Sequence, residues 1–205
     1  MCTIQSLYGG SRIAGELAGV ARDGFGTNIT DDDANNHILN VDFLHLIYVQ
    51  GRLVGFASYD IFEFSGTKVL YLSGVVIRKD NQTKGLAKMS LGNAIGTIRP
   101  DVLTMRTQNP VVYHLASEFA KEIYPSDGLH GPSYELCISV GEYVAVNRLG
   151  MRNYQKELFF EKGTYGTALN DKVPDVVDGR ARSVFEGLKL DRQRGDSIII
   201  VAMLR

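Results

Sequence analysis

The segment from Gly74 to Leu91, GVVIRKDNQTKGLAKMSL, changes from one side-chain pattern to another, and this change strongly constrains the fold. It begins as an apolar run typical of a strand and continues as an amphipathic helix that Pro100 ends. A second β-patterned run follows at 102–108. A strand, a helix and a strand joined by short connections form a crossover unit, so the two strands are predicted to lie parallel in one sheet.

The turn between this strand and helix has a composition suited to an anion. It contains Gln82, Lys84, Gly85 and Ala87, and no carboxylate follows Asp80. A helix N-terminus presents free N–H groups and a partial positive charge, and a glycine lets a phosphate approach the backbone. The alternative is a connection in which the glycine serves only the turn. Two other phosphate motifs, G-x-x-x-x-G-K-[ST] and G-x-G-x-x-G after a strand, are absent.

Three β-patterned runs lead up to this turn. Tight turns are expected at Gln50-Gly51 and Ser65-Gly66, because glycine tolerates positive φ. We therefore predict an antiparallel meander with strands at 43–49, 53–62 and 68–77. Upstream, the pattern predicts a strand at 2–8 and a helix at about 11–21, after Ser11, that buries Leu17, Val20 and Ala21. A loop at 23–28 and a short capped helix at 30–39 are predicted to follow.

The chain after the crossover unit begins with a helix start. Asn109 is a suitable N-cap and Pro110 a suitable first helical residue. The expected buried stripe of this helix consists of Val112, Leu115 and Phe119. Further helices are predicted at 134–148 and 180–194, and the apolar run SIIIVAML at 197–204 is predicted to be a strand in the central sheet.

Bulk properties exclude several classes of function. With 22 basic and 23 acidic residues among 205, the chain has no electrostatic footprint for nucleic acid. Its two cysteines lie far apart and form no metal-ligand spacing, and no metal site is expected. No membrane-length apolar run and no signal peptide are visible, so a cytoplasmic location is expected. We predict one domain over 1–205, with a helical elaboration at about 125–195.

The stretch VVIRKDNQTKGLA resembles the central motif of the GCN5-related N-acetyltransferase (GNAT) superfamily, whose acyl-CoA loop reads Q/R-x-x-G-x-G/A. Gln82, Gly85 and Ala87 occupy the defined positions. The order of elements is also similar, over about residues 3–120 and the final strand. The resemblance implies an α/β fold with a mixed, mostly antiparallel sheet, flanking helices and a V-shaped splay between the fourth and fifth strands.

The resemblance also implies how acetyl-CoA would bind as a cosubstrate. The pantetheine arm would pair with the backbone of the fourth strand, and the pyrophosphate would rest on backbone N–H groups of the turn. Asn109 would contact the cofactor; the alternative is a plain helix cap. The implied cofactor-binding residues are Val75, Val76, Ile77, Gln82, Thr83, Lys84, Gly85, Leu86, Ala87 and Asn109.

The sequence departs from the family at the catalytic acid. The place of the usual tyrosine, which protonates the departing thiolate, is held by Ala116, Ser117 and Glu118. Tyr113 is the best substitute, and its alternative role is packing beside Val112. Candidate bases are no clearer, because each has an equally plain structural role: Asp60, Glu63, Tyr71, Ser73, His45 and His114.

The function predicted from these residues is transfer of an acetyl group from acetyl-CoA to an amine. The acceptor is a small molecule or a peptide, with no nucleic acid or membrane as partner, and a homodimer is left open. One alternative is a CoA-binding module without catalysis, because the usual tyrosine is missing. The other is an interaction protein that uses residues 125–195 as a partner surface.

Overall fold

A computed structural model of the chain describes residues 1–7, 14–25, 41–128, 130–169 and 178–205. The chain divides into two compact units. The first consists of Met1–Phe62 and Leu70–Arg99, and the second of Glu63–Val69 and Pro100–Arg205. The prediction of one domain over the whole chain is not tested by this division and stays a prediction.

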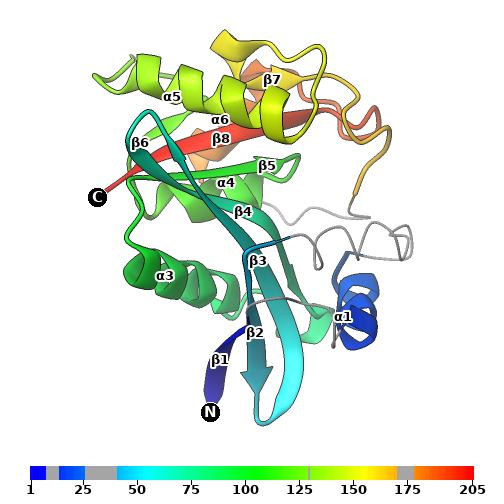
Figure 1. The fold of residues 1–205 in the computed structure, drawn as a ribbon. Helices are drawn as coiled ribbons and strands as arrows, with labels where there is room; N and C mark the ends of the chain where they lie inside the picture. Colours follow the sequence, from blue (N-terminus) through cyan, green and yellow to red (C-terminus); the bar gives the residue numbers. More distant parts are fainter. Residues whose placement is uncertain (8–13, 26–40, 129, 170–177) are drawn as a thin grey trace. The chain divides into compact units, whose positions relative to one another are not determined.

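The first unit contains the predicted meander (Figure 1). Its strands lie in the order β1 (Cys2–Leu7), β2 (Phe43–Val49), β3 (Arg52–Phe64) and β4 (Thr67–Ile77). The pairs β1–β2 and β2–β3 are antiparallel. Gln50 and Gly51 both have positive φ, 52° and 79°, which is the backbone geometry that a two-residue hairpin turn requires.

Two helices cover opposite faces of these strands. Leu17 and its neighbours on α1 (Ala14–Phe25) pack in a cluster with Leu46 of β2. The first residue of α3 (Leu86–Ile98) packs in another cluster with Ile47. Successive side chains of a strand point to opposite faces, so α1 and α3 lie on different sides of β2.

A buried polar network fixes α3 on its face. The Ser90 hydroxyl lies 3.0 Å from His45 Nδ1 and 3.1 Å from the Tyr59 hydroxyl. All three side chains are buried, and the His45 and Tyr59 rings pack edge to face. Burial lowers the pKa of the His45 imidazole, against an opposing effect of a hydrogen bond with Ser90. The ring therefore stays neutral at pH 7, and His45 is a packed residue of this network.

The second unit is built around the C-terminal strand. β8 (Ser197–Leu204) lies between β5 (Val102–Thr107) and β6 (Ala120–Tyr124) and is antiparallel to both. The two-residue β7 (Phe160–Glu161) also pairs with it. The beginning of β4 belongs to this unit, where Lys68 O accepts from Asp101 N at 2.9 Å. The predicted strand at 197–204 is thus confirmed as a central strand.

The strand order is therefore β1-β2-β3-β4-β5-β8-β6, with β4 and β5 parallel. This mixed, mostly antiparallel sheet with flanking helices confirms the predicted fold class. The predicted splay between β4 and β5 stays a prediction. No helix within the described ranges is long and apolar enough to cross a membrane.

The helices after β6 confirm one prediction and correct another. α5 (Tyr134–Glu142) runs along β8 and continues as a π-helical turn over Tyr143–Arg148, so the helix predicted at 134–148 is confirmed (Figure 1). α6 (Gly179–Gly187) ends earlier than predicted, because the backbone turns at Lys189, which has φ 49°.

The predicted buried stripe of α4 (Pro110–Ser117) was right at Leu115 and wrong at Val112 and Phe119. The helix has only two turns, so Phe119 lies outside it, and Val112 is only half-buried. The buried residues are Tyr113, Leu115 and Ala116. The predicted loop at 23–28 was also wrong at its start, because Asp23–Phe25 end α1. The helix start after Ser11 and the helix at 30–39 lie outside the described residues.

Candidate functional site

The predicted anion-binding turn begins with a 3₁₀ turn, η1 (Lys79–Asn81), and ends at the first residue of α3. Thr83 and Gly85 both have left-handed backbone angles, with φ 62° and 73°. Gly85 is the N-cap of α3, no side chain caps the helix, and its first turn contains no acidic residue. The first N–H groups of a helix have no partner within it, so this end of α3 offers donors to a ligand.

Gly85 is required by its backbone angle and not by crowding. Beyond the adjoining chain, a Cβ at this position would meet no described atom within 4 Å. Its positive φ, however, is one that residues with a Cβ adopt at a cost of about 1–2 kcal/mol. The surface over Gly85 is therefore open, and a phosphate could approach the backbone there.

Gln82 ties the turn to the elements on either side of it. Its Nε2 donates to Ile77 O at the end of β4, at 2.9 Å, and to Gly24 O in α1, at 3.3 Å. A Cβ at Gly24 would overlap the Val76 side chain and lie 2.9 Å from Ile77 O, so only glycine lets α1 approach the strand this closely. The Gln82 side chain therefore shapes the site.

The Lys84 ammonium lies against the same turn. Its Nζ donates to Asp80 O at 2.7 Å and to Asn81 Oδ1 at 3.4 Å. The nearby Asp80 carboxylate pairs with Arg52 at 3.3 Å and accepts from Asn81 Nδ2 at 2.7 Å. The one acid of the turn is thus held by a cation and an amide, which lowers its repulsion of an incoming anion.

The end of β4 supplies the backbone expected to meet pantetheine. Val76 and Ile77 are buried, and their side chains belong to the two clusters on opposite faces of the strands. Val75 is half-buried. The carbonyl of Ile77 already accepts from Gln82, so the predicted pairing would have to use other N–H and C=O groups of this segment. That pairing stays a prediction.

Sequence reasoning missed three residues that build this turn: Asp23, Gly24 and Asn81. Asp23 Oδ2 accepts from Lys79 N at 3.0 Å, which holds the start of η1 against α1. This contact joins residues 56 positions apart, so no local sequence pattern predicts it. Gly24 belongs to a lone G-x-G in the sequence, within the segment that is predicted to be a loop.

Asn109 and Tyr113 lie in the second unit. Asn109 Oδ1 accepts from Val111 N at 2.9 Å, with Pro110 next to it, so the residue is a helix cap as predicted. Its backbone N–H donates to Thr107 Oγ1 at 2.9 Å. The cofactor contact of Asn109 stays a prediction.

The Tyr113 phenol has a partner of its own. The side chain is fully buried, its hydroxyl donates to Pro125 O at 2.8 Å, and its ring packs edge to face against Phe185. Burial is the main cause that raises the pKa of this phenol above its ordinary value. Acid catalysis by Tyr113 therefore requires that its hydrogen bond to Pro125 breaks, and the role stays a prediction.

His114, another candidate, is paired at the protein surface. Its Nδ1 lies 2.9 Å from Asp178 Oδ2, and Asp178 also caps α6 by accepting from Arg180 N. Burial acts to raise the pKa of the Asp178 carboxyl, but the hydrogen bonds from His114 and Arg180 outweigh it and lower that pKa. Asp60 and Tyr71 are buried, and Glu63 is exposed. In the part of the chain that the structure covers, no cluster of His, Cys, Asp or Glu could hold a metal ion.

Comparison with known proteins gives the class of fold. No family model matches the sequence, and no curated protein sequence matches it. Among solved structures, the chain is similar to the ribosomal-protein-S18-alanine N-acetyltransferase from Escherichia coli, with a TM-score of 0.56 and 12% identity over 100% of this chain and 94% of that one. It is also similar to Arabidopsis thaliana NAA60 in complex with a bisubstrate analogue, with a TM-score of 0.53 and 12% identity over 99% and 100% of the two chains.

These similarities show that the chain has the fold of the GCN5-related N-acetyltransferases, which confirms the predicted resemblance at the level of fold. At 12% identity they define the fold and leave the acceptor open.

Proposed function

We propose that this protein binds acetyl-CoA through the turn at 82–87 and transfers the acetyl group to an amine. The observation that carries the proposal is the uncapped N-terminus of α3, which follows two left-handed residues and has no acid in its first turn. Its fold, shared with N-acetyltransferases, supports the same conclusion. A cytoplasmic location, expected from the sequence, remains part of the proposal.

In this proposal the pyrophosphate rests on the backbone N–H groups between Gln82 and Ala87. Gly85 leaves room for it, and the helix N-terminus supplies a partial positive charge. The Gln82 side chain is already hydrogen-bonded to the end of β4 and the Lys84 side chain to Asp80 O, so the turn is held in place before a ligand arrives. A preformed site avoids part of the entropic cost of binding.

The reaction would be a direct transfer from the thioester to the amine. The amine nitrogen forms a bond to the acetyl carbon, the carbon–sulfur bond breaks, the nitrogen loses a proton and the sulfur gains one. We propose that a backbone N–H near Val76 polarises the thioester carbonyl and that positioning supplies most of the rate enhancement. Either Tyr113 or water would protonate the sulfur.

The test is release of free thiol from acetyl-CoA by the full chain. The amine panel would contain short peptides with different first residues and small-molecule amines, and each reaction would be repeated with the Gly85→Glu variant. Thiol release that depends on one class of amine and is lost in the variant supports the proposal. Absence of both CoA binding and thiol release would overturn it.

A second candidate, a CoA-binding module without catalysis, is favoured by the state of Tyr113. Its hydroxyl is bonded to Pro125, and the usual tyrosine position holds Ala116, Ser117 and Glu118. Saturable CoA binding without thiol release across the panel would select this candidate. A protein that binds no CoA and uses residues 125–195 as an interaction surface is the remaining alternative.

A further inference from the structure

The second unit contains a cavity of about 250 Å³ whose lining includes none of the residues proposed to bind acetyl-CoA. It is formed by the end of β6 and the loop after it, the start of α5, the 3₁₀ turn η3 (Lys156–Leu158) and α6. Ligand sites are typically concave, mostly apolar and furnished with a few polar groups. The residues of this cavity follow that description.

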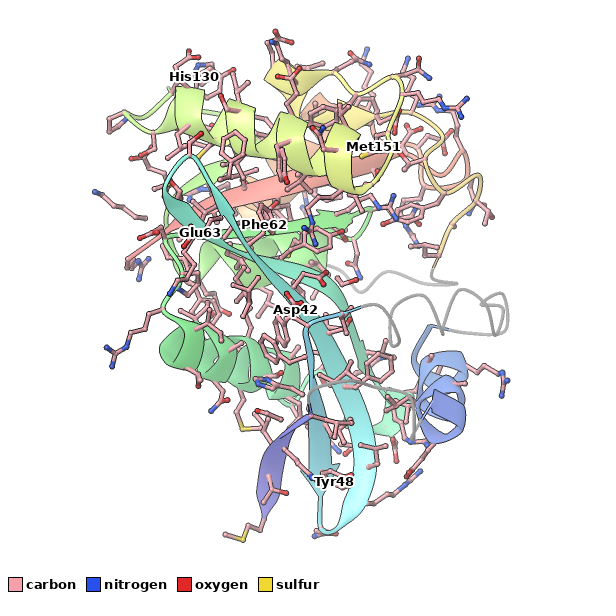
Figure 2. The ribbon with its side chains drawn as sticks, in the orientation of Figure 1. Asp42, Tyr48, Phe62, Glu63, His130 and Met151 are labelled. Carbon is pink, nitrogen blue, oxygen red and sulfur yellow. The ribbon has the colours of Figure 1, made fainter. Side chains whose placement is uncertain are left out.

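Aromatic rings form one part of the cavity lining. Tyr124 and Phe159 are stacked, with ring centroids 5.9 Å apart and an angle of 16° between their planes. His130 and Tyr134 are also stacked, at 3.5 Å and 21°, and Figure 2 shows His130 beside the start of α5. The faces of such rings carry negative electrostatic potential and attract cations.

The charges of the lining have one sign. It contains two carboxylates, those of Asp127 and Glu157, and no lysine or arginine. Neither carboxylate forms an ion pair with any residue that the structure describes. Glu157 acts on the Tyr134 phenol, whose pKa is raised first by burial and then by the negative charges of Glu135 and Glu157. The cavity is therefore negative as well as aromatic.

Ser126 adds an unused polar group. Its hydroxyl oxygen is buried, and it has no hydrogen-bond partner among the described residues. Buried hydroxyls in folded proteins almost always have a partner, so one without a partner beside a cavity points to a group that comes from a ligand. A ligand N–H could donate to this oxygen.

We propose that this cavity binds a small organic ammonium ion, the protonated amino group of an alkylamine. Its charge would face Asp127 and Glu157, its N–H groups would reach Ser126, and its alkyl part would contact the rings of Tyr134 and Phe159. This site shares no residue with the turn at 82–87, and binding to it is proposed to require no CoA.

The experiment is a titration of the full chain with propylammonium chloride at constant ionic strength, followed by protein NMR. 1-Propanol serves as the neutral analogue of the same size. Glu157→Gln and Tyr134→Leu test the charge and the ring. Glu135→Gln is the matched control, because Glu135 lies beside Tyr134 on α5 but does not line the cavity.

Saturable shifts of residues around the cavity with propylammonium, and none with 1-propanol, are expected. Glu157→Gln and Tyr134→Leu should each weaken binding by about fivefold, whereas Glu135→Gln should weaken it clearly less, because Glu135 does not line the cavity. If Tyr134→Leu does not fold, Glu157→Gln alone decides, because Glu157 is exposed. Equal shifts with the alcohol, no saturable binding, or equal weakening by Glu135→Gln would overturn the proposal.

A lysine derivative, Nα-acetyl-lysine methylamide, tests whether the ammonium group belongs to a peptide. If it binds at least tenfold more tightly than propylammonium, the small-molecule assignment is overturned.

Discussion

Replacing Gly85 by glutamate is predicted to remove CoA binding while the protein stays folded. Gly85 has φ 73°, so any side chain there strains the backbone by about 1–2 kcal/mol. That is less than the 5–15 kcal/mol of stability typical of a folded domain. Beyond the adjoining chain, no described atom lies within 4 Å of the new Cβ, so the first atom of the side chain has room.

The effect on binding follows from the charge of the new side chain at the N-cap of α3. A carboxylate about 5 Å from one negative charge of the pyrophosphate costs roughly 3 kcal/mol at an effective dielectric constant of 20. That energy corresponds to a weakening of CoA binding by about 100-fold or more. The loss of approach to the backbone adds to it.

Gly51→Glu is the matched control for this variant. Gly51 also has a left-handed backbone, with φ 79°, and also has no described atom within 4 Å of a Cβ, but it lies in the β2–β3 turn. Both variants should lose similar stability in thermal unfolding, and only Gly85→Glu should lose affinity in calorimetric titration with CoA. An affinity of Gly85→Glu within threefold of the wild type, or an equal loss in Gly51→Glu, would refute the reasoning.

Three further predictions concern the rest of the molecule. Tyr113→Phe removes the hydrogen bond to Pro125 and should lower the free energy of unfolding by about 1 kcal/mol, measured by denaturant titration. If the variant also turns over at least tenfold more slowly with its CoA affinity intact, the phenol is assigned as the acid. His45 has a lowered pKa in the folded state, so the unfolded chain takes up the proton first and the free energy of unfolding should fall as the pH drops below about 6.5. His45→Phe should remove this dependence. The same pH profile of unfolding in the variant and the wild type would contradict the prediction. Truncation after Gly195 removes β8, which lies between β5 and β6 and is buried along Ile198–Ala202, so the product should be insoluble or unfolded; a soluble, cooperatively melting product would show that β8 is dispensable.

Local patterns predicted much of the fold. The Gln50-Gly51 turn was predictable because glycine tolerates positive φ, and the structure has positive φ at both residues. Asn109 and Pro110 marked a helix start by their individual chemistry. The run at 197–204 was too apolar and β-branched to lie in water, and the structure buries it in the sheet. The same patterns gave a buried stripe for α4 that was wrong at Val112 and Phe119, because two helical turns are too short to define a periodicity.

The candidate site was predictable only where it is local. Gly85 and the acid-free helix start could be recognised from adjacent residues, because their function depends on backbone conformation. The contacts of Gln82 with Gly24 and of Lys79 with Asp23 join segments more than fifty residues apart. The partner of Tyr113 is set by how β6 and the loop after it pack on α4. Such contacts follow from tertiary packing and leave no signal in a single sequence.

The most direct test of the central claim is amide hydrogen exchange of the full chain with and without CoA. If the N–H groups at the start of α3 hold the pyrophosphate, the amides of residues 83–88 should exchange markedly more slowly with CoA present. Pantetheine, which lacks the pyrophosphate, should leave these amides unchanged. Saturable CoA binding without protection of residues 83–88, or equal protection by pantetheine, would contradict the account.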